Sequence, residues 1–102
     1  MGERIAIIGT GLTKFGEHWN KGLRDLAIEA GSMAMQDAKI SSKEIDAMYV
    51  GNMSAGRFAG QEHLGALIAD QIGLNIPSIR VEGACASGSL AIREGMFSIL
   101  SG

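Results

Sequence analysis

The chain has 102 residues, enough for one domain at most, and a chain of this size buries roughly two-thirds of its unfolded surface. With 46% hydrophobic residues, 20% charged residues and a net charge of -2, it lacks the polybasic field that nucleic acid or anionic lipid would require. No apolar stretch approaches the roughly 18 residues of a membrane span, and no signal-peptide core follows Met1. A lone cysteine cannot form an internal disulfide, which suits a reducing compartment. We therefore expect a cytoplasmic protein without nucleic-acid or membrane partners.

The first half of the chain predicts a strand, a helix and a second strand. Arg4 to Gly9 (RIAIIG) is a continuous apolar run, rich in β-branched residues and typical of a strand buried on both faces of a parallel sheet. From Leu23 to about Ala38 the apolar residues recur at helical spacing, with charged residues mostly on the opposite side. Ser41 or Ser42 resembles the capped start of a short helical turn, and Ala47 to Gly51 predicts the second strand.

The second half predicts a loop, a helix, a third strand and a last helix. Ser54 to Gln61 has neither strand nor helix periodicity, whereas about Glu62 to Ile72 is amphipathic and ends at Gly73. Ser78 to Glu82 alternates in polarity and leads into the final helix. The order β-α-β-α-β-α indicates an α/β fold with a parallel sheet core and ligand sites at the carboxyl ends of its strands. Three parallel strands leave two open edges and an uncovered face, so the chain looks unfinished.

Cys85 is the candidate nucleophile. It lies in the segment VEGACASG, where the third strand ends and a helix begins. A helix N-terminus offers backbone N–H groups and a partial positive charge, which favour a thiolate over a thiol. The small neighbours Ala84, Ala86, Ser87 and Gly88 leave the sulfur uncrowded. Two alternatives stay open at this point: an inert, buried cysteine, and a redox-sensing thiol.

Other candidates for chemistry are weaker. His18 lies in a polar turn and His63 starts a helix, and nothing in the sequence pairs either with Cys85, so we expect solvated or helix-end roles. Glu82 is close to the cysteine, but alternation alone would place a polar residue there. Gly9-Thr10-Gly11 lacks the third glycine of a dinucleotide-binding loop. Two distant histidines and one cysteine have no workable metal-ligand spacing, so we expect no metal site.

Taken together, the motifs resemble the thiolase family, particularly the archaeal acetyl-CoA acetyltransferases that are similar to sterol-carrier-protein-type thiolases. The opening Ile5 to Gly16 (IAIIGTGLTKFG) looks like that family's first strand and turn, and Ala59-Gly60-Gln61 resembles the segment before its nucleophile. The most specific match is Ile76 to Gly88 (IPSIRVEGACASG), which puts Cys85 in the nucleophile's place.

The resemblance implies a thiolase-like fold and a reversible Claisen condensation in which the cysteine is acylated by one acyl-CoA and passes the acyl group to a second. Coenzyme A would then be substrate, with no permanently bound cofactor. Family members take histidines, a second acid/base group and most of the coenzyme A pocket from their carboxyl-terminal half. We therefore expect residues 1–102 to be an incomplete amino-terminal domain that is inactive without that half.

The resemblance also implies partners. It suggests a homo-oligomer or a complex with a chain that supplies the carboxyl-terminal half, and for archaeal members a place early in the mevalonate pathway of lipid metabolism beside a hydroxymethylglutaryl-CoA synthase and a small zinc-containing protein. The alternative is a non-catalytic scaffold or binding subunit of a thiolase-like complex, because the chain has no evident general base of its own. Acyl-chain length, reaction direction and the identity of the acid/base residues stay open.

Overall fold

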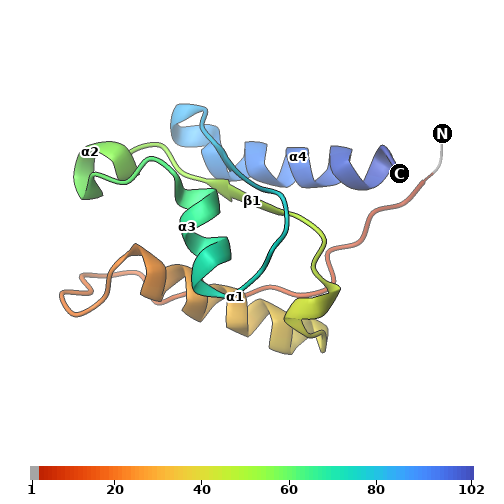
Figure 1. The fold of residues 1–102 in the computed structure, drawn as a ribbon, viewed down its shortest axis with the longest axis horizontal. Helices are drawn as coiled ribbons and strands as arrows, with labels where there is room; N and C mark the ends of the chain where they lie inside the picture. Colours follow the sequence, from red (N-terminus) through yellow and green to blue (C-terminus); the bar gives the residue numbers. More distant parts are fainter. Residues whose placement is uncertain (1–2) are drawn as a thin grey trace.

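The computed structural model describes residues 3–102 and has a parallel two-stranded sheet at its centre, with helices packed around it (Figure 1). Strand β1 (Met48–Gly51) pairs with strand β2 (Ser78–Val81), with Gly51 opposite Val81. The three longer helices are α1 (Leu23–Ala38), α3 (Leu64–Gln71) and α4 (Ser87–Leu100), and the short ones are η1 (Ser42–Glu44), α2 (Ala55–Ala59) and η2 (Ala84–Ala86). The predicted α/β class is therefore confirmed.

The helices lie on both sides of the sheet. Figure 1 shows α4 on one side of β1, with α3 and then α1 on the other. The buried core sits around α3 and consists of Ala55, Leu64, Ile68 and Ala69. Gly65 allows α3 to approach the sheet closely, since a Cβ there would lie 2.8 Å from the backbone of Ser78. Within the described part of the chain, no helix combines the length and the apolar character needed to cross a membrane.

Local signals set the ends of the predicted helices. The N–H of Gly22 donates to Oδ2 of Asp25 at 2.8 Å, which satisfies a backbone donor at the start of α1. The helix ends at Lys39, whose left-handed conformation (φ 59°) turns its N–H back to the carbonyl of Gln36. The turn predicted after Ser41 is also confirmed, because the N–H of Ser41 donates to Oε2 of Glu44 at 2.8 Å.

The strand predicted over Arg4 to Gly9 does not form, and that prediction is wrong for this structure. Residues 3–22 contain no helix or strand, and Ile7 is 76% exposed. A strand requires a neighbouring backbone for its hydrogen bonds, and β1 and β2 are paired with each other. The segment lies against α1 instead, where the N–H of Thr10 donates to Oδ2 of Asp37 at 3.0 Å.

The loop predicted over Ser54 to Gln61 contains a short helix, which corrects that prediction. The N–H of Ala55 donates to Oδ1 of Asn52 at 2.8 Å and so begins α2. The helix ends at Gly60, whose φ of 65° favours glycine. Five residues are too few to show an apolar period, which is why the sequence pattern missed this helix.

Candidate active site

Cys85 lies in η2, in the turn between the carboxyl end of β2 and the start of α4, and its side chain is exposed. The strand-to-helix junction predicted for it is therefore present. Because β1 and β2 are parallel, both strands end at this edge of the sheet. Figure 1 shows the turn at the end of the molecule where α2 also lies. Cys85 is therefore not buried in this structure, unlike the alternative of a buried core cysteine.

The buried side chain of Ser87 forms two hydrogen bonds with the backbone of this turn. Its hydroxyl donates to the carbonyl of Ala84 at 2.7 Å and accepts the N–H of Gly83 at 3.0 Å. The N–H of Ala86 closes the turn by donating to the carbonyl of Gly83 at 3.1 Å. Ser87 is only 4% exposed. Sequence reasoning treated it merely as a small neighbour, although a serine at a helix start is a familiar capping signal.

Glu82 has a structural role in the same turn. Its Oε2 accepts the N–H of Ala84 at 2.6 Å, while the residue itself is exposed. Ala84 adopts a left-handed conformation with φ of 53°, which is uncommon for a residue with a Cβ. A polar strand-end residue was expected at position 82, and the structure adds that this carboxylate binds the strained turn.

Helix α4 begins at Ser87, two residues after the cysteine. The start of a helix carries a partial positive charge and backbone donors, and here it adjoins the turn of Cys85. Close packing fixes the helix against the sheet, because a Cβ on Gly51 would overlap the carbonyl of Ser87. The end of β1 therefore sets where α4 starts.

A second set of hydrogen bonds fixes the loop that follows β1, next to the cysteine turn. Arg80 in β2 donates from Nε to the carbonyl of Asn52 at 3.1 Å and from a terminal nitrogen to the carbonyl of Met53 at 2.8 Å. The N–H of Asn52 extends the sheet by donating to the carbonyl of Val81 at 3.1 Å. Sequence analysis missed this arrangement, and the only signal was an arginine within an otherwise strand-like run.

The two histidines do not join Cys85 through any hydrogen bond found in residues 3–102. His18 donates from Nε2 to the carbonyl of Lys14 at 2.6 Å, in the amino-terminal segment. His63 precedes α3, and its N–H donates to the side chain of Gln61 at 2.8 Å. Among the described residues no group of three or more His, Cys, Asp or Glu side chains is arranged to hold a metal ion.

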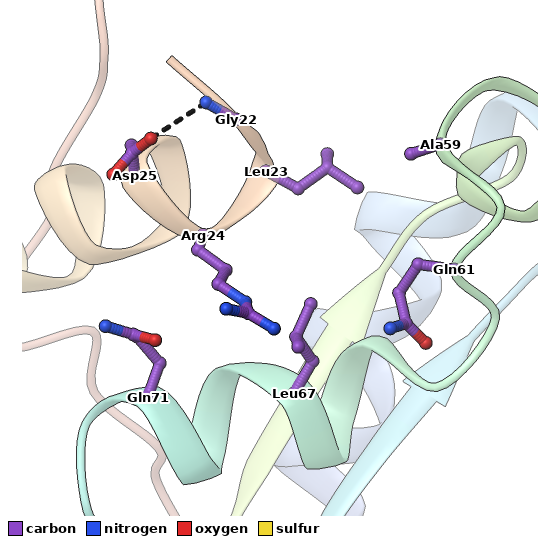
Figure 2. A pocket seen from close by; sticks show the side chains of 8 residues that line it. All are labelled: Gly22, Leu23, Arg24, Asp25, Ala59, Gln61, Leu67 and Gln71. Carbon is purple, nitrogen blue, oxygen red and sulfur yellow. Dashed lines mark hydrogen bonds between the residues drawn. The ribbon is translucent and has the colours of Figure 1, made fainter.

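An open pocket of about 530 Å³ lies elsewhere, between the start of α1 on one side and α3 with the segment leading into it on the other (Figure 2). The guanidinium of Arg24 reaches toward Leu67, and Leu23 points toward Ala59. The lining residues are Gly22, Leu23, Arg24, Asp25, Ala59, Gln61, Leu67 and Gln71. Cys85 is not among them, so this pocket is separate from the cysteine turn.

Glycines in the amino-terminal segment serve packing. A Cβ at Gly9 or Gly11 would overlap the backbone of α1, at Ala34 and Ala30 respectively. The N–H of Thr10 between them is already bonded to Asp37. This arrangement accounts for the Gly-Thr-Gly sequence without a bound dinucleotide.

Comparison with known proteins relates almost the whole chain to one family. The family described as "Thiolase, N-terminal domain" matches residues 5–102. A protein named acetyl-CoA acetyltransferase from Methanocaldococcus jannaschii is 60% identical over 99 residues, which cover 96% of this chain and 25% of that protein. Its namesake from Methanothermobacter thermautotrophicus is 56% identical, with 96% and 26% covered.

More distant relatives point the same way. Human sterol carrier protein 2 is 36% identical over 93 residues, which cover 87% of this chain and 16% of that protein. The chain spans about a quarter of the length of the two acetyltransferases that it matches. The chain belongs to the thiolase family, with residues 5–102 matching the family's N-terminal domain.

Proposed function

We propose that this chain carries the nucleophile of a thiolase-type acyltransferase that acts on acetyl-CoA, with Cys85 as the acyl carrier. The observation that carries the proposal is the position of Cys85: it is exposed on a turn where two parallel strands end and a 14-residue helix begins. Family membership and the names of the two archaeal relatives support the choice of acetyl-CoA as substrate.

In the first half-reaction, the Cys85 thiolate attacks the thioester carbonyl carbon of acetyl-CoA. The new S–C bond forms, the bond between that carbon and the coenzyme A sulfur breaks, and coenzyme A leaves as a thiolate that takes up a proton. Donors near the turn would stabilise the oxyanion between these two events. One thioester replaces another of similar energy, so the acetyl group is carried without loss of activation.

In the second half-reaction, a second acetyl-CoA loses a proton from its methyl carbon to a base. The resulting carbanion attacks the acetyl group on Cys85, a carbon–carbon bond forms, and the cysteine leaves as a thiolate. Acetoacetyl-CoA is the product. The family resemblance puts this base, the proton donor and most of the coenzyme A pocket outside these 102 residues. In keeping with this, the bonds of His18 and His63 go to groups other than Cys85. The chain by itself would then not complete a condensation.

The resemblance supplies the rest of the proposal. Coenzyme A is a substrate and no cofactor is held permanently. The working protein is a homo-oligomer, or a complex in which another chain supplies the carboxyl-terminal half, and it acts in the cytoplasm at an early step of the mevalonate pathway. A hydroxymethylglutaryl-CoA synthase and a small zinc-containing protein are the partners to look for.

The experiment is intact-mass measurement after incubation with acetyl-CoA, on the native protein together with any chain that accompanies it. We expect a single added acetyl group that is absent in Cys85→Ala and retained in Ser89→Ala, a change at an exposed serine of α4. If the folded native protein gains no acetyl group, the acyltransferase proposal is wrong.

The second candidate is a scaffold or binding subunit, favoured by the lack of a histidine bonded to Cys85 in residues 3–102. It predicts that Cys85→Ala leaves both assembly and the activity of the assembled complex unchanged. Measuring acetoacetyl-CoA formation by the complex with wild-type and Cys85→Ala chains separates the two functions. A redox-sensing thiol would instead show peroxide-dependent modification of Cys85 and no reaction with acetyl-CoA.

A further inference from the structure

Ser87 stands apart from the other polar residues of the described chain. Among the polar residues of 3–102, Ser87 is the one that is buried. Only 4% of its surface is exposed, although it lies two residues from the exposed Cys85. Burying a hydroxyl is unfavourable unless its hydrogen bonds are made. Here the hydroxyl both donates and accepts, and both of its partners belong to the turn that carries Cys85.

These bonds hold the backbone just before the cysteine. The hydroxyl accepts from the N–H of Gly83 and donates to the carbonyl of Ala84, so it spans the peptide unit that joins them. Ala84 is in the left-handed region, with φ of 53°, which a residue with a Cβ adopts only when its surroundings hold it there. The exposed carboxylate of Glu82 accepts a hydrogen bond from the N–H of Ala84.

The backbone after the cysteine is held as well. Ser87 is the first residue of α4, and its own N–H donates to the carbonyl of Ala84. Close contact with Gly51 at the end of β1 fixes the backbone of Ser87 against the sheet. The hydroxyl thus connects the sheet and the start of α4 to Ala84, the left-handed residue next to Cys85.

We propose that Ser87 is a positioning residue for Cys85: its hydroxyl fixes the direction of the thiol relative to the start of α4. This inference rests on the proposed acyl transfer and deepens it. A thiol that reacts with a bound thioester must be oriented toward the carbonyl carbon, and a misplacement of about 1 Å can slow such a reaction by roughly a hundredfold. Reaction with a small mobile reagent has no such requirement.

The test compares two reactions of the same thiol in the native protein with any chain that accompanies it. One is acetylation of Cys85 by acetyl-CoA, and the other is its alkylation by iodoacetamide, both followed by intact mass. The ratio of the two rates reports orientation, provided that circular dichroism shows each variant to be folded, because iodoacetamide also alkylates unfolded chain. Ser87→Ala removes both hydroxyl bonds, Ser87→Thr keeps the hydroxyl, and Ser89→Ala is the matched control on the same helix.

We expect Ser87→Ala to lower the ratio at least tenfold, as expected for a misplaced group. Ser87→Thr should stay within about threefold of the wild type because its hydroxyl can form the same bonds, and Ser89→Ala should leave the ratio unchanged. An unchanged ratio in Ser87→Ala overturns the inference, and so does an equal fall in Ser87→Thr.

A second variant covers the case in which Ser87→Ala does not fold. Ala84→Gly removes the left-handed strain, since glycine adopts positive φ freely. The double variant Ala84→Gly/Ser87→Ala should fold, and its ratio should be at least tenfold below that of Ala84→Gly alone; equal ratios overturn the inference. If the wild type is alkylated but never acetylated, the proposed function fails and this inference falls with it. Acetylation of the wild type with no effect of Ser87→Ala removes only the inference.

Discussion

Two regions with similar strand-like sequences adopt different structures. One is the cysteine edge, which is strand β2 together with the turn that carries Cys85, and the other is the amino-terminal segment, residues 3–22. Arg4 to Gly9 has the stronger β pattern, yet it forms no strand. Ser78 to Val81 is shorter and contains an arginine, yet it pairs with β1 along its whole length. The difference teaches that a β pattern describes side chains that suit a sheet, while a strand also requires a backbone beside it.

The two regions also differ in how far their side chains are buried. In the turn that carries Cys85, the N–H of Gly83 and the carbonyl of Ala84 are bonded to the Ser87 hydroxyl, and Ser87 is buried. In the amino-terminal segment, Phe15 is 84% exposed and Trp19 is 89% exposed. Four apolar side chains of α4 are exposed as well: Ile92, Phe97, Ile99 and Leu100. Hydrogen bonds within the chain thus organise the cysteine turn, whereas apolar side chains of the amino-terminal segment and of α4 are exposed.

Hydrogen exchange would show the largest contrast between the two regions. In the 102-residue chain, the N–H groups of Met48 and Asn52, which bond to the carbonyls of Pro77 and Val81, should exchange at least about a hundredfold more slowly than those of Ile5 to Ile8. The reason is that bonded sheet amides exchange only after an opening, while the segment over residues 5–8 has no strand partner. Residue-resolved exchange by NMR makes the measurement. Equal protection of both sets would contradict the comparison, and slower exchange of Ile5 to Ile8 in a native complex would show that a partner completes the strand.

Gly51→Ala should lower the free energy of unfolding by about 2 to 3 kcal/mol. The new Cβ would overlap the backbone of Ser87, and neither the strand nor the helix backbone can move away easily. Urea unfolding measures the change. The matched control is Gly31→Ala in α1, an exposed residue where a Cβ meets nothing within 4 Å. This control should stabilise the protein by about 0.5 to 1 kcal/mol through helix propensity. A loss at Gly51 no greater than about 0.5 kcal/mol would show that β1 and α4 are less tightly joined than the structure indicates.

Arg80→Met should have a smaller effect, about 1 kcal/mol of destabilisation, since it removes two hydrogen bonds to the loop after β1 but leaves the apolar stem. The control is Arg57→Met on α2, an exposed position where we expect a change within about 0.5 kcal/mol. Chemical unfolding of both variants under the same conditions gives the comparison. Equal effects at the two arginines would mean that the bonds to Asn52 and Met53 add nothing to the order of the cysteine edge.

Helices were the best-predicted part of the fold, because their determinants lie within a few residues. The apolar period placed α1 at the residues where it is found, and the periodicity over residues 62–72 located α3 to within two residues at its start. Ser41, which caps the start of η1, lies three residues before Glu44, so this turn was also visible in the sequence. The five-residue helix α2 was missed because it is too short to carry a period.

For the candidate site, the sequence located the cysteine but not its support. A single thiol among small residues between a strand pattern and a helix pattern was enough to single out Cys85, and the resemblance gave it a proposed role. The contribution of Ser87 depends on a bond to the carbonyl of Ala84 and another from Gly83, and that of Arg80 depends on a loop 27 to 28 residues away. Residue types do not reveal which of several possible partners a polar group will meet.

By itself, the sequence determined the three longer helices, the cysteine at a strand-to-helix junction and membership of the thiolase family, because each of these is encoded in short runs of neighbouring residues. Only the tertiary structure decided that Arg4 to Gly9 stays unpaired, that Ser87 is buried beneath the turn and that Gly51 fixes the start of α4. These features depend on contacts between segments far apart along the chain, and such contacts form only where the packed helices and sheet bring the segments together.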